Sequence, residues 1–193
     1  MAEDPAGLLQ SSGPGARRYA EVGLSAPLGD FRILAKFDLV ILTPDGSARI
    51  LDWKTARKRP RRPWLADRWQ TRVYPYLLAR AGADLNQGRP ILPDRIEMVY
   101  WFADFPAQPE RFVYTAAAFE KDQSELSDLT ATIHRLAADQ FPLTDNEKRC
   151  VYCEYRSLCE RGIRAGAIDE QSLDEVEIGL VDLDLEQIAE IEF

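Results

Sequence analysis

The amino-acid sequence predicts an α/β domain whose mixed β-sheet is flanked by helices. Several short segments alternate their side chains in the pattern of strands, and two longer segments repeat their apolar residues at helical spacing. The order along the chain is strands, helix, strands, helix, which favours this class. A length of 193 residues is enough for one domain with a substantial core.

The first half of the predicted sheet is a hairpin preceded by another strand. Residues 1–18 are rich in Ser, Gly and Pro and are expected to be irregular, and a strand is expected over residues 19–24. Residues 31–42 form a second strand that is apolar on both faces and should therefore be covered on both sides. One of its faces is expected to hold Ile33, Ala35, Phe37, Leu39 and Ile41. A Pro-Asp-Gly turn at residues 44–46 leads into a third strand over residues 48–54, so the two strands form a hairpin.

The second half alternates helices and strands. Residues 64–81 have helical spacing, and Pro75 is expected to kink this helix because its ring removes one backbone hydrogen bond. Residues 95–103 and 111–115 are expected to be strands, and residues 116–138 a helix. The inward face of this last helix is expected to hold Phe119, Leu126, Leu129, Ile133 and Leu136.

The charge is unevenly distributed along the chain. All 24 Lys and Arg residues lie at or before Arg164, and ten of the 32 Asp and Glu residues lie after it. Residues 1–164 therefore carry 24 positive and 22 negative side chains, a net charge of +2, whereas the tail carries −10. A mildly basic body with an acidic tail is compatible with nucleic-acid binding.

The sequence predicts a cytoplasmic protein without membrane contact. No apolar run approaches the ~20 residues that span a bilayer, and the N-terminus lacks the basic start and apolar stretch of a signal peptide. The three cysteines are then thiols or metal ligands rather than disulfides. We expect four parts: an irregular N-terminal segment (1–18), a catalytic core (19–140), a cysteine-rich segment (141–164) and an acidic tail (165–193).

The hairpin carries the residues with the clearest chemistry. If the turn centres on Asp45, opposing residues have numbers that sum to about 90, which places Asp38 opposite Asp52 with Cβ atoms roughly 5 Å apart. Asp52 and Lys54 share a face because side chains alternate along a strand. Two facing carboxylates can hold Mg²⁺ together with water and phosphate oxygens. A surface salt bridge between Asp52 and Lys54 is the structural alternative, and the hairpin alone leaves both interpretations open.

The wider pattern resembles the PD-(D/E)xK nucleases, specifically the RecB-like branch. That branch includes the CRISPR-associated RecB-like exonucleases and the nuclease domains of bacterial recombination helicases. Its GxxD strand is matched by Ala35-Lys36-Phe37-Asp38, with alanine in place of glycine, its DxK strand by Asp52-Trp53-Lys54, and its QxxxY helix by Gln70 and Tyr74. The resemblance covers roughly residues 21–159 and implies a restriction-endonuclease-like core.

The resemblance also implies roles for these residues. Asp38 and Asp52 would bind Mg²⁺ or Mn²⁺, with the Trp53 carbonyl as a third ligand, and Lys54 would be the catalytic lysine. Gln70 and Tyr74 would contact the DNA or orient the lysine; the alternative is a surface glutamine and a packed tyrosine. Glu21 would approach the site, and the alternative for it is an ordinary edge-strand glutamate.

Basic residues follow the DxK motif closely. Beside a phosphodiester-cleaving site they would hold the DNA backbone by charge, although a solvated loop is the simpler explanation of such a run. The proposed contacts are Arg57, Lys58, Arg59, Arg61, Arg62, Arg68 and Arg72.

Three cysteines end the region of resemblance. Cys150, Cys153 and Cys159 match the trio that, in the RecB-like branch, binds a four-iron four-sulfur cluster with one upstream cysteine. This chain has no fourth cysteine, and its only histidine is His134, whereas the family carries a metal-ligating histidine near its start. We therefore expect the chain to be N-terminally shortened. The alternatives are a zinc site completed by His134 or water, and reduced thiols in a short helical knot. If the cysteines are the remnant of an iron–sulfur site, their three sulfurs should lie close together.

The sequence as a whole predicts a metal-dependent deoxyribonuclease of the RecB-like exonuclease type. DNA is its expected partner, with a protein partner in DNA repair or defence. The alternative is a non-catalytic DNA-binding or scaffold module that keeps the nuclease fold. Strandedness, exo- versus endonucleolytic cutting and oligomeric state are not determined by the sequence.

Overall fold

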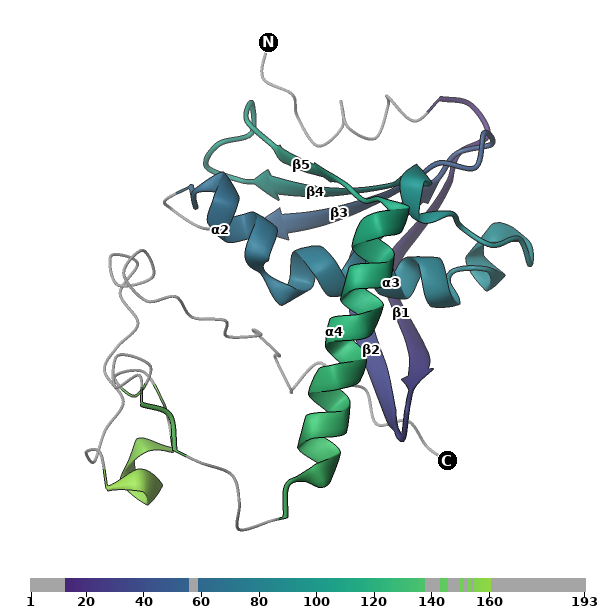
Figure 1. The fold of residues 1–193 in the computed structure, drawn as a ribbon. Coiled ribbons are helices and arrows are strands. Elements are labelled where there is room, and N and C mark those ends of the chain that lie inside the picture. Colours follow the sequence, from purple (N-terminus) through teal and green to yellow (C-terminus); the bar gives the residue numbers. More distant parts are fainter. Residues whose placement is uncertain are drawn as a thin grey trace.

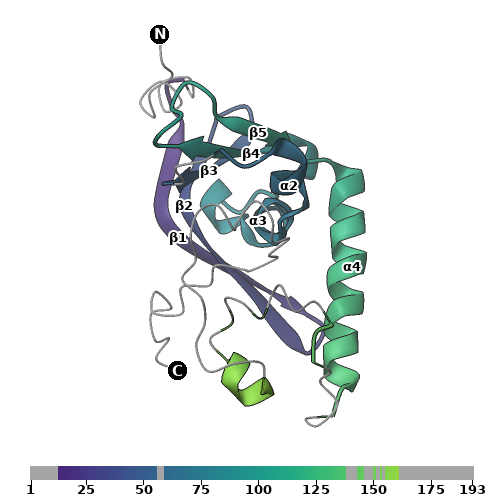
Figure 2. The ribbon, with the colours of Figure 1, turned by 90° about the vertical axis from the view of Figure 1, so that its left-hand side faces the viewer.

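The structure is a computed structural model that describes residues 13–55, 59–137, 143–145, 150, 153 and 155–160. A five-stranded sheet lies at its centre, with helices packed on one side of it (Figures 1 and 2). The strands are β1 (Arg17–Leu28), β2 (Phe31–Leu42), β3 (Ala48–Lys54), β4 (Ile96–Phe102) and β5 (Glu110–Val113), and the helices are α2 (Arg62–Asp67), α3 (Trp69–Ala81) and α4 (Ala116–Arg135). Short 3₁₀ turns span Asp84–Asn86, Pro93–Arg95 and Arg156–Cys159.

The sheet is mixed, as the sequence predicted. Its strand order is β1-β2-β3-β4-β5, with β3 and β4 parallel and the other neighbours antiparallel. The chain leaves β3, forms α2 and α3 over the sheet, and returns as β4, so a helical crossover joins the two parallel strands (Figure 1). The predicted α/β fold, a mixed sheet flanked by helices, is therefore confirmed.

The hairpin register follows the prediction. Leu39 lies opposite Leu51 and Val40 opposite Ile50, so each pair of numbers sums to 90. The turn is locked locally because the Asp45 carboxylate accepts hydrogen bonds from the Ser47 amide at 3.2 Å and the Ser47 hydroxyl at 2.9 Å. Its Thr43 and Ser47 donors hold the pKa of Asp45 at about 2. A local turn thus fixes the pairing of β2 and β3.

The predicted alternation along β2 is wrong beyond Phe37. Ala35 and Phe37 face the helices, but so do Val40 and Leu42, while Leu39 and Ile41 lie in a second apolar cluster with Leu51 and Val99. The cause is a local irregularity in the paired strands. Glu21 has a left-handed φ of 52°, and the pairing of β1 and β2 skips Glu21 and Asp38. Asp38 therefore sits where the strand changes face.

The predicted helix over residues 64–81 is two helices. The helix is interrupted at Arg68, whose backbone is extended with a ψ of 140°. Arg68 therefore separates α2 from α3. Pro75, the expected point of distortion, lies buried inside the 13-residue α3. The Thr71 hydroxyl donates to the Leu65 carbonyl across the break, which replaces one backbone bond that a continuous helix would make.

The second half of α4 departs from the predicted inward face. Leu126 is buried and Phe119 packs on the core, but Leu129 and Ile133 are 43% and 39% exposed. The helix ends at Arg135 rather than residue 138, and its second half extends past α3 alongside the β1–β2 hairpin (Figure 2). Its apolar spacing therefore continues beyond the surface that could bury it.

Candidate active site

Asp52 and Lys54 lie at the end of β3 and point toward the helices. The Asp52 side chain is only 4% exposed, and its Oδ2 atom lies 2.9 Å from Lys54 Nζ. Burying a carboxylate beside a partly buried ammonium costs free energy unless further hydrogen bonds satisfy both groups. Gln70 makes such hydrogen bonds.

Gln70 joins these two residues from the first turn of α3. Its Nε2 atom donates to Asp52 Oδ1, and its Oε1 atom accepts from Lys54 Nζ at 3.0 Å. The glutamine therefore fixes the carboxylate and the ammonium at the same time. Of the roles that the resemblance implied for it, orienting the lysine is the one that these contacts fit.

Asp38 approaches the same end of β3 from the neighbouring strand. Its Oδ2 atom accepts the backbone N–H of Trp53 at 2.9 Å, just beyond the last Leu39–Leu51 pair of the ladder. The irregularity in β2 turns this side chain toward β3. The Asp38 charge contributes to a raised pKa of Asp52, so the two carboxylates interact electrostatically.

Burial dominates the electrostatics of Asp52. It raises the pKa of Asp52 to about 6, against the opposing effect of the nearby Lys54 charge. In metal-free protein, this carboxyl is therefore largely protonated in mildly acidic solution. A cation placed beside it would favour the ionised form.

Tyr74 lies one helical turn after Gln70 and is mostly packed. Its ring is 4.9 Å from that of Phe37, and the Gln70 side chain lies near its hydroxyl. Burial and then the Asp52 charge raise the pKa of Tyr74 to about 12. The residue is therefore a neutral support for Gln70 at ordinary pH.

The carboxylates fit a hard divalent cation. Asp52 Oδ2 is buried, and no donor among the described residues reaches it in hydrogen-bonding geometry, although Lys54 Nζ lies 2.9 Å away. Carboxylate oxygens are the ligands that Mg²⁺ and Mn²⁺ prefer, so this unsatisfied oxygen and the neighbouring Asp38 carboxylate fit such an ion. No three His, Cys, Asp or Glu side chains of the described residues form a metal-binding group, so further ligands would be backbone, water or phosphate oxygens.

Comparison with known families agrees with this geometry. A model of the PD-(D/E)XK nuclease superfamily matches residues 4–160, most of the chain. The chain belongs to the PD-(D/E)XK nuclease superfamily. The matched region contains every residue of the cluster just described, and the superfamily assignment predicted from the motifs is confirmed.

Two solved structures are similar to this superfamily member at low sequence identity. One is the protein SSO0001, at 18% identity with a TM-score of 0.47, covering 82% of this chain and 68% of that one. The other is a candidate exonuclease from Eubacterium rectale, at 13% identity with a TM-score of 0.46, covering 80% of this chain and 56% of that one. No curated protein matches the sequence significantly.

Several of the arginines predicted to contact DNA form ion pairs with carboxylates of the same chain. Arg59 and Arg62 both pair with Glu110, a residue on β5 whose side chain is only 10% exposed. Arg72 pairs with Asp122 and Glu125 on α4. The sequence analysis missed these partners because they lie about 50 residues away along the chain.

Arg61 and Arg68, from the same run, have no carboxylate partner among the described residues. Arg61 is exposed at the start of α2, and the Arg68 guanidinium stacks on the Trp64 ring at 4.6 Å. The Arg68 charge also lowers the pKa of Asp52, in opposition to burial, which places it near the cluster. Arg57 and Lys58 lie outside the described residues.

Glu21 and His134 do not join the cluster. The Glu21 carboxylate is 65% exposed and lies 3.0 Å from Lys36 Nζ, which fits the edge-strand alternative. His134 is an exposed residue on α4, 3.8 Å from Asp30 and edge-on to Phe31. It is therefore not the fourth ligand of a cysteine site.

The three cysteines do not converge as expected. Cys150, Cys153 and Cys159 are half-buried and belong to no disulfide, and the described residues contain no group of three metal-ligating side chains. The predicted convergence of three sulfurs is thus wrong. The structure gives no support to an iron–sulfur or zinc site here.

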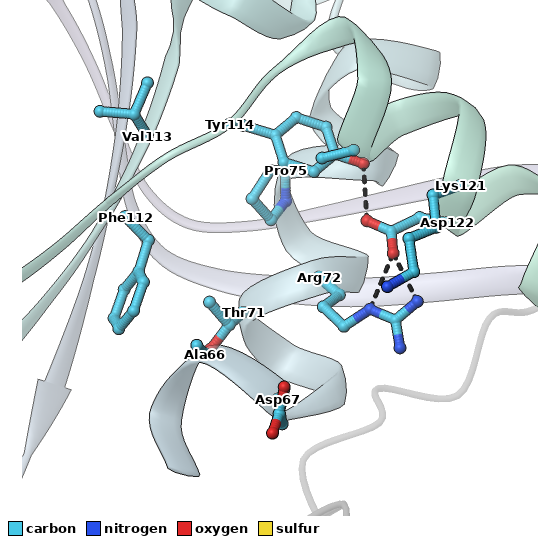
Figure 3. A pocket seen from close by; sticks show the side chains of 11 residues that line it. Ala66, Asp67, Thr71, Arg72, Pro75, Phe112, Val113, Tyr114, Lys121 and Asp122 are labelled. Atoms are coloured by element: carbon cyan, nitrogen blue, oxygen red, sulfur yellow. Dashed lines mark hydrogen bonds and ion pairs between the residues drawn. The ribbon is translucent and has the colours of Figure 1, made fainter. Parts of the chain in front are cut away.

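Two cavities of the described part are formed without Asp52 and Lys54. One of about 240 Å³ lies between α2–α3, β5 and α4 and is lined by Arg72, Tyr114 and Asp122 (Figure 3). Another of about 290 Å³ lies near Arg49 and Arg95. Neither is lined by Asp52 or Lys54. No helix in the described ranges has the length and apolarity needed to cross a bilayer.

Proposed function

We propose that this chain hydrolyses DNA phosphodiester bonds with Mg²⁺ or Mn²⁺, using Asp38, Asp52 and Lys54. The observation that carries the proposal is the Asp52–Lys54–Gln70 cluster, in which a buried carboxylate and an ammonium are held together at the end of a strand. Superfamily membership supports nuclease chemistry. The RecB-like branch belongs to the proposal and is supported by the ordered DxK and QxxxY motifs. An exonucleolytic mode enters the proposal only through the resemblance to that branch.

Each residue has a distinct task in this proposal. Asp38 and Asp52 would hold the cation, with the Trp53 carbonyl as a third ligand. When bound, the ion supplies Lewis-acid chemistry to the phosphate. The Lys54 ammonium orients the attacking water and offsets negative charge that builds on the phosphate. Gln70 keeps Lys54 directed at the same point as Asp52, and Tyr74 supports Gln70.

The proposed architecture keeps the four parts expected from the sequence. Residues 19–140 would form the nuclease core, preceded by the 1–18 segment and followed by the cysteine-rich segment (141–164) and acidic tail (165–193). The tail lies outside the described residues.

The first experiment tests the requirement for metal. Purified protein incubated with end-labelled DNA is expected to cleave it with Mg²⁺ or Mn²⁺, to stop when EDTA is added, and to resume when excess Mg²⁺ is restored. A non-catalytic DNA-binding module, the alternative function, would shift the DNA in a gel but leave it uncut under all of these conditions.

The raised pKa of Asp52 predicts how stability depends on pH in metal-free protein. The unfolded carboxyl ionises near 3.8 and the folded one near 6, so ionisation favours the unfolded state. Stability should therefore fall by about 3 kcal/mol as pH rises from 4 to 7, then stay level. Urea denaturation in EDTA measures this.

A neutral isostere provides the comparison for this pH dependence. Asp52→Asn should not show the fall in stability between pH 4 and 7, while Asp67→Asn, at an exposed position on α2, should still show it. Parallel pH curves for wild type and Asp52→Asn would contradict the burial of an ionisable group here. Added Mg²⁺ should stabilise wild type at pH 8 and leave Asp52→Asn unaffected.

Arg61 and Arg68, which have no carboxylate partner among the described residues, are the arginines whose loss should weaken DNA binding. Arg61→Ala and Arg68→Ala should each weaken binding and reduce the slope of log Kd against log salt by about 1, because each removes one phosphate contact. Fluorescence anisotropy in Ca²⁺ or EDTA measures binding without cleavage. Arg89→Ala, exposed far along the chain, serves as the control, and an equal effect of Arg89→Ala would refute a localised contact.

A further inference from the structure

The Lys54 ammonium has a third neighbour besides Asp52 and Gln70. Its Nζ atom lies over the ring of Tyr100, 5.6 Å from the ring centroid. A cation within about 6 Å of an aromatic face is attracted by the negative charge of the π system. The three neighbours come from β3, α3 and β4, so the lysine is held from three separate elements.

Tyr100 is itself firmly fixed. It is fully buried and lies opposite Asp52 in the parallel register of β3 and β4. Its hydroxyl lies 2.7 Å from Thr71 Oγ1. Because the single Thr71 hydroxyl hydrogen is donated to the Leu65 carbonyl, the Tyr100 hydroxyl must be the donor in its bond to Thr71.

This chain of bonds connects the lysine to the break between α2 and α3. Leu65 lies on α2 and Thr71 on α3, so the Thr71 hydroxyl bridges both helices and Tyr100 at once. Phe112 packs edge-on against the Tyr100 ring at 6.1 Å and limits its rotation. Burial, and then the Asp52 charge, raise the pKa of Tyr100, so the phenol stays neutral beside the ammonium.

We propose that Tyr100 is a positioning residue that holds the Lys54 ammonium over its ring face, with Thr71 fixing the ring. The inference rests on the proposed function of Lys54. A lysine side chain has four rotatable bonds, and Asp52 alone could hold its end in several directions. A fixed ring below the ammonium selects the direction that also reaches Gln70. The aromatic ring, rather than the hydroxyl, is the part that contacts the lysine.

The test compares variants that keep or remove the ring. Tyr100→Phe keeps the ring, whereas Tyr100→Met fills much of the same space with a flexible apolar chain. The full 193-residue chain is used. The first readout is the ¹H–¹³C NMR signal of the Lys54 ε-methylene, assigned by its loss in Lys54→Met, because protons above an aromatic face are shifted upfield. The second is kcat and KM for DNA cleavage.

The proposal predicts an upfield Lys54 signal in wild type, a smaller upfield shift in Tyr100→Phe, which keeps the ring but not its bond to Thr71, and an ordinary shift in Tyr100→Met. Tyr100→Met should also lower kcat about tenfold with KM unchanged, while Tyr100→Phe, which keeps the ring but loses its bond to Thr71, should lower kcat only several-fold, as Thr71→Val should. An ordinary Lys54 shift in wild type would overturn the proposal. So would an upfield shift, or wild-type kcat, in folded Tyr100→Met.

A second variant covers the case in which Tyr100→Met does not fold. Thr71→Val leaves the ring in place and removes its anchor, so the Lys54 signal should move downfield toward the ordinary position, with a several-fold lower kcat and no change in KM. An unchanged signal and kcat in Thr71→Val would overturn the anchoring role. The NMR readout needs no catalysis. If wild type shows the upfield signal but cuts no DNA, the proposed function fails while the contact stands.

Discussion

Replacing Lys54 by methionine is expected to lower the rate of metal-dependent DNA cleavage by about 100- to 1000-fold. Methionine keeps the length of the stem but removes the ammonium that lies 2.9 Å from Asp52 Oδ2 and 3.0 Å from Gln70 Oε1. Removing one group that stabilises charge in the transition state has an effect of this size. Asp52→Asn should have a comparable effect because the amide cannot supply the negative charge that holds a cation. Cleavage of end-labelled DNA under single-turnover conditions measures both.

Matched controls separate the active site from general charge effects. Lys121→Met changes an exposed lysine on α4, whose side chain is 70% exposed, and should cleave at the wild-type rate. The double variant of Asp52→Asn and Lys54→Met should be scarcely slower than the slower single variant, because the two residues act as a unit. Cleavage by Lys54→Met at the wild-type rate would place the activity at another site or in a contaminating nuclease.

Asp122→Ala is expected to destabilise the protein by about 3–5 kcal/mol. The buried Asp122 carboxylate accepts from Arg72 Nε at 2.7 Å and from the Tyr114 hydroxyl at 2.9 Å (Figure 3). Its removal leaves a partly buried guanidinium and a buried hydroxyl without this acceptor, and breaking such a pair has an effect of this size. The loss would also loosen α3, which carries Gln70. Urea denaturation at pH 7 measures the change in the free energy of unfolding.

Glu125→Ala is the control for this network. Glu125 pairs with the same guanidinium, but its side chain is 42% exposed, so water can replace it and the loss of stability should be much smaller than for Asp122→Ala. Equal destabilisation by the two variants would show that burial of Asp122 is not the cause. A small effect of Asp122→Ala alone would show that α4 is not anchored through this pair.

The site was predictable from sequence where its geometry is local. The turn at residues 44–46 closes on itself through Asp45, so counting outward from it gives the Leu39–Leu51 register that the structure has. The strand period then sets Asp52 and Lys54 on one face. By contrast, only the resemblance to the family's motifs linked Gln70 to the DxK strand in the sequence. The hydrogen bonds from Gln70 to Asp52 and Lys54 became evident only in the folded structure.

The charged residues show where sequence reasoning stops. A cluster of arginines after β3 predicts a DNA-binding surface, but a sequence does not reveal which of them meet a carboxylate from a distant element. Glu110 takes up Arg59 and Arg62, and Asp122 takes up Arg72, across separations of 48 to 51 residues. These pairings leave Arg61 and Arg68 as the better candidates among the described residues.

Periodicity and turn chemistry act over a few residues, so the class of fold, the hairpin register and the shared face of Asp52 and Lys54 could be predicted from the sequence. Three other features could not be predicted in this way. The change of face in β2 that turns Asp38 toward β3 depends on a left-handed residue in the neighbouring strand. The break at Arg68 that aims Gln70 at Asp52 is held by Thr71 and Tyr100. The exposure of Leu129 and Ile133 depends on where the surface beneath α4 ends. Each of these rests on contacts between segments distant in sequence, and packing between such segments can override local propensity.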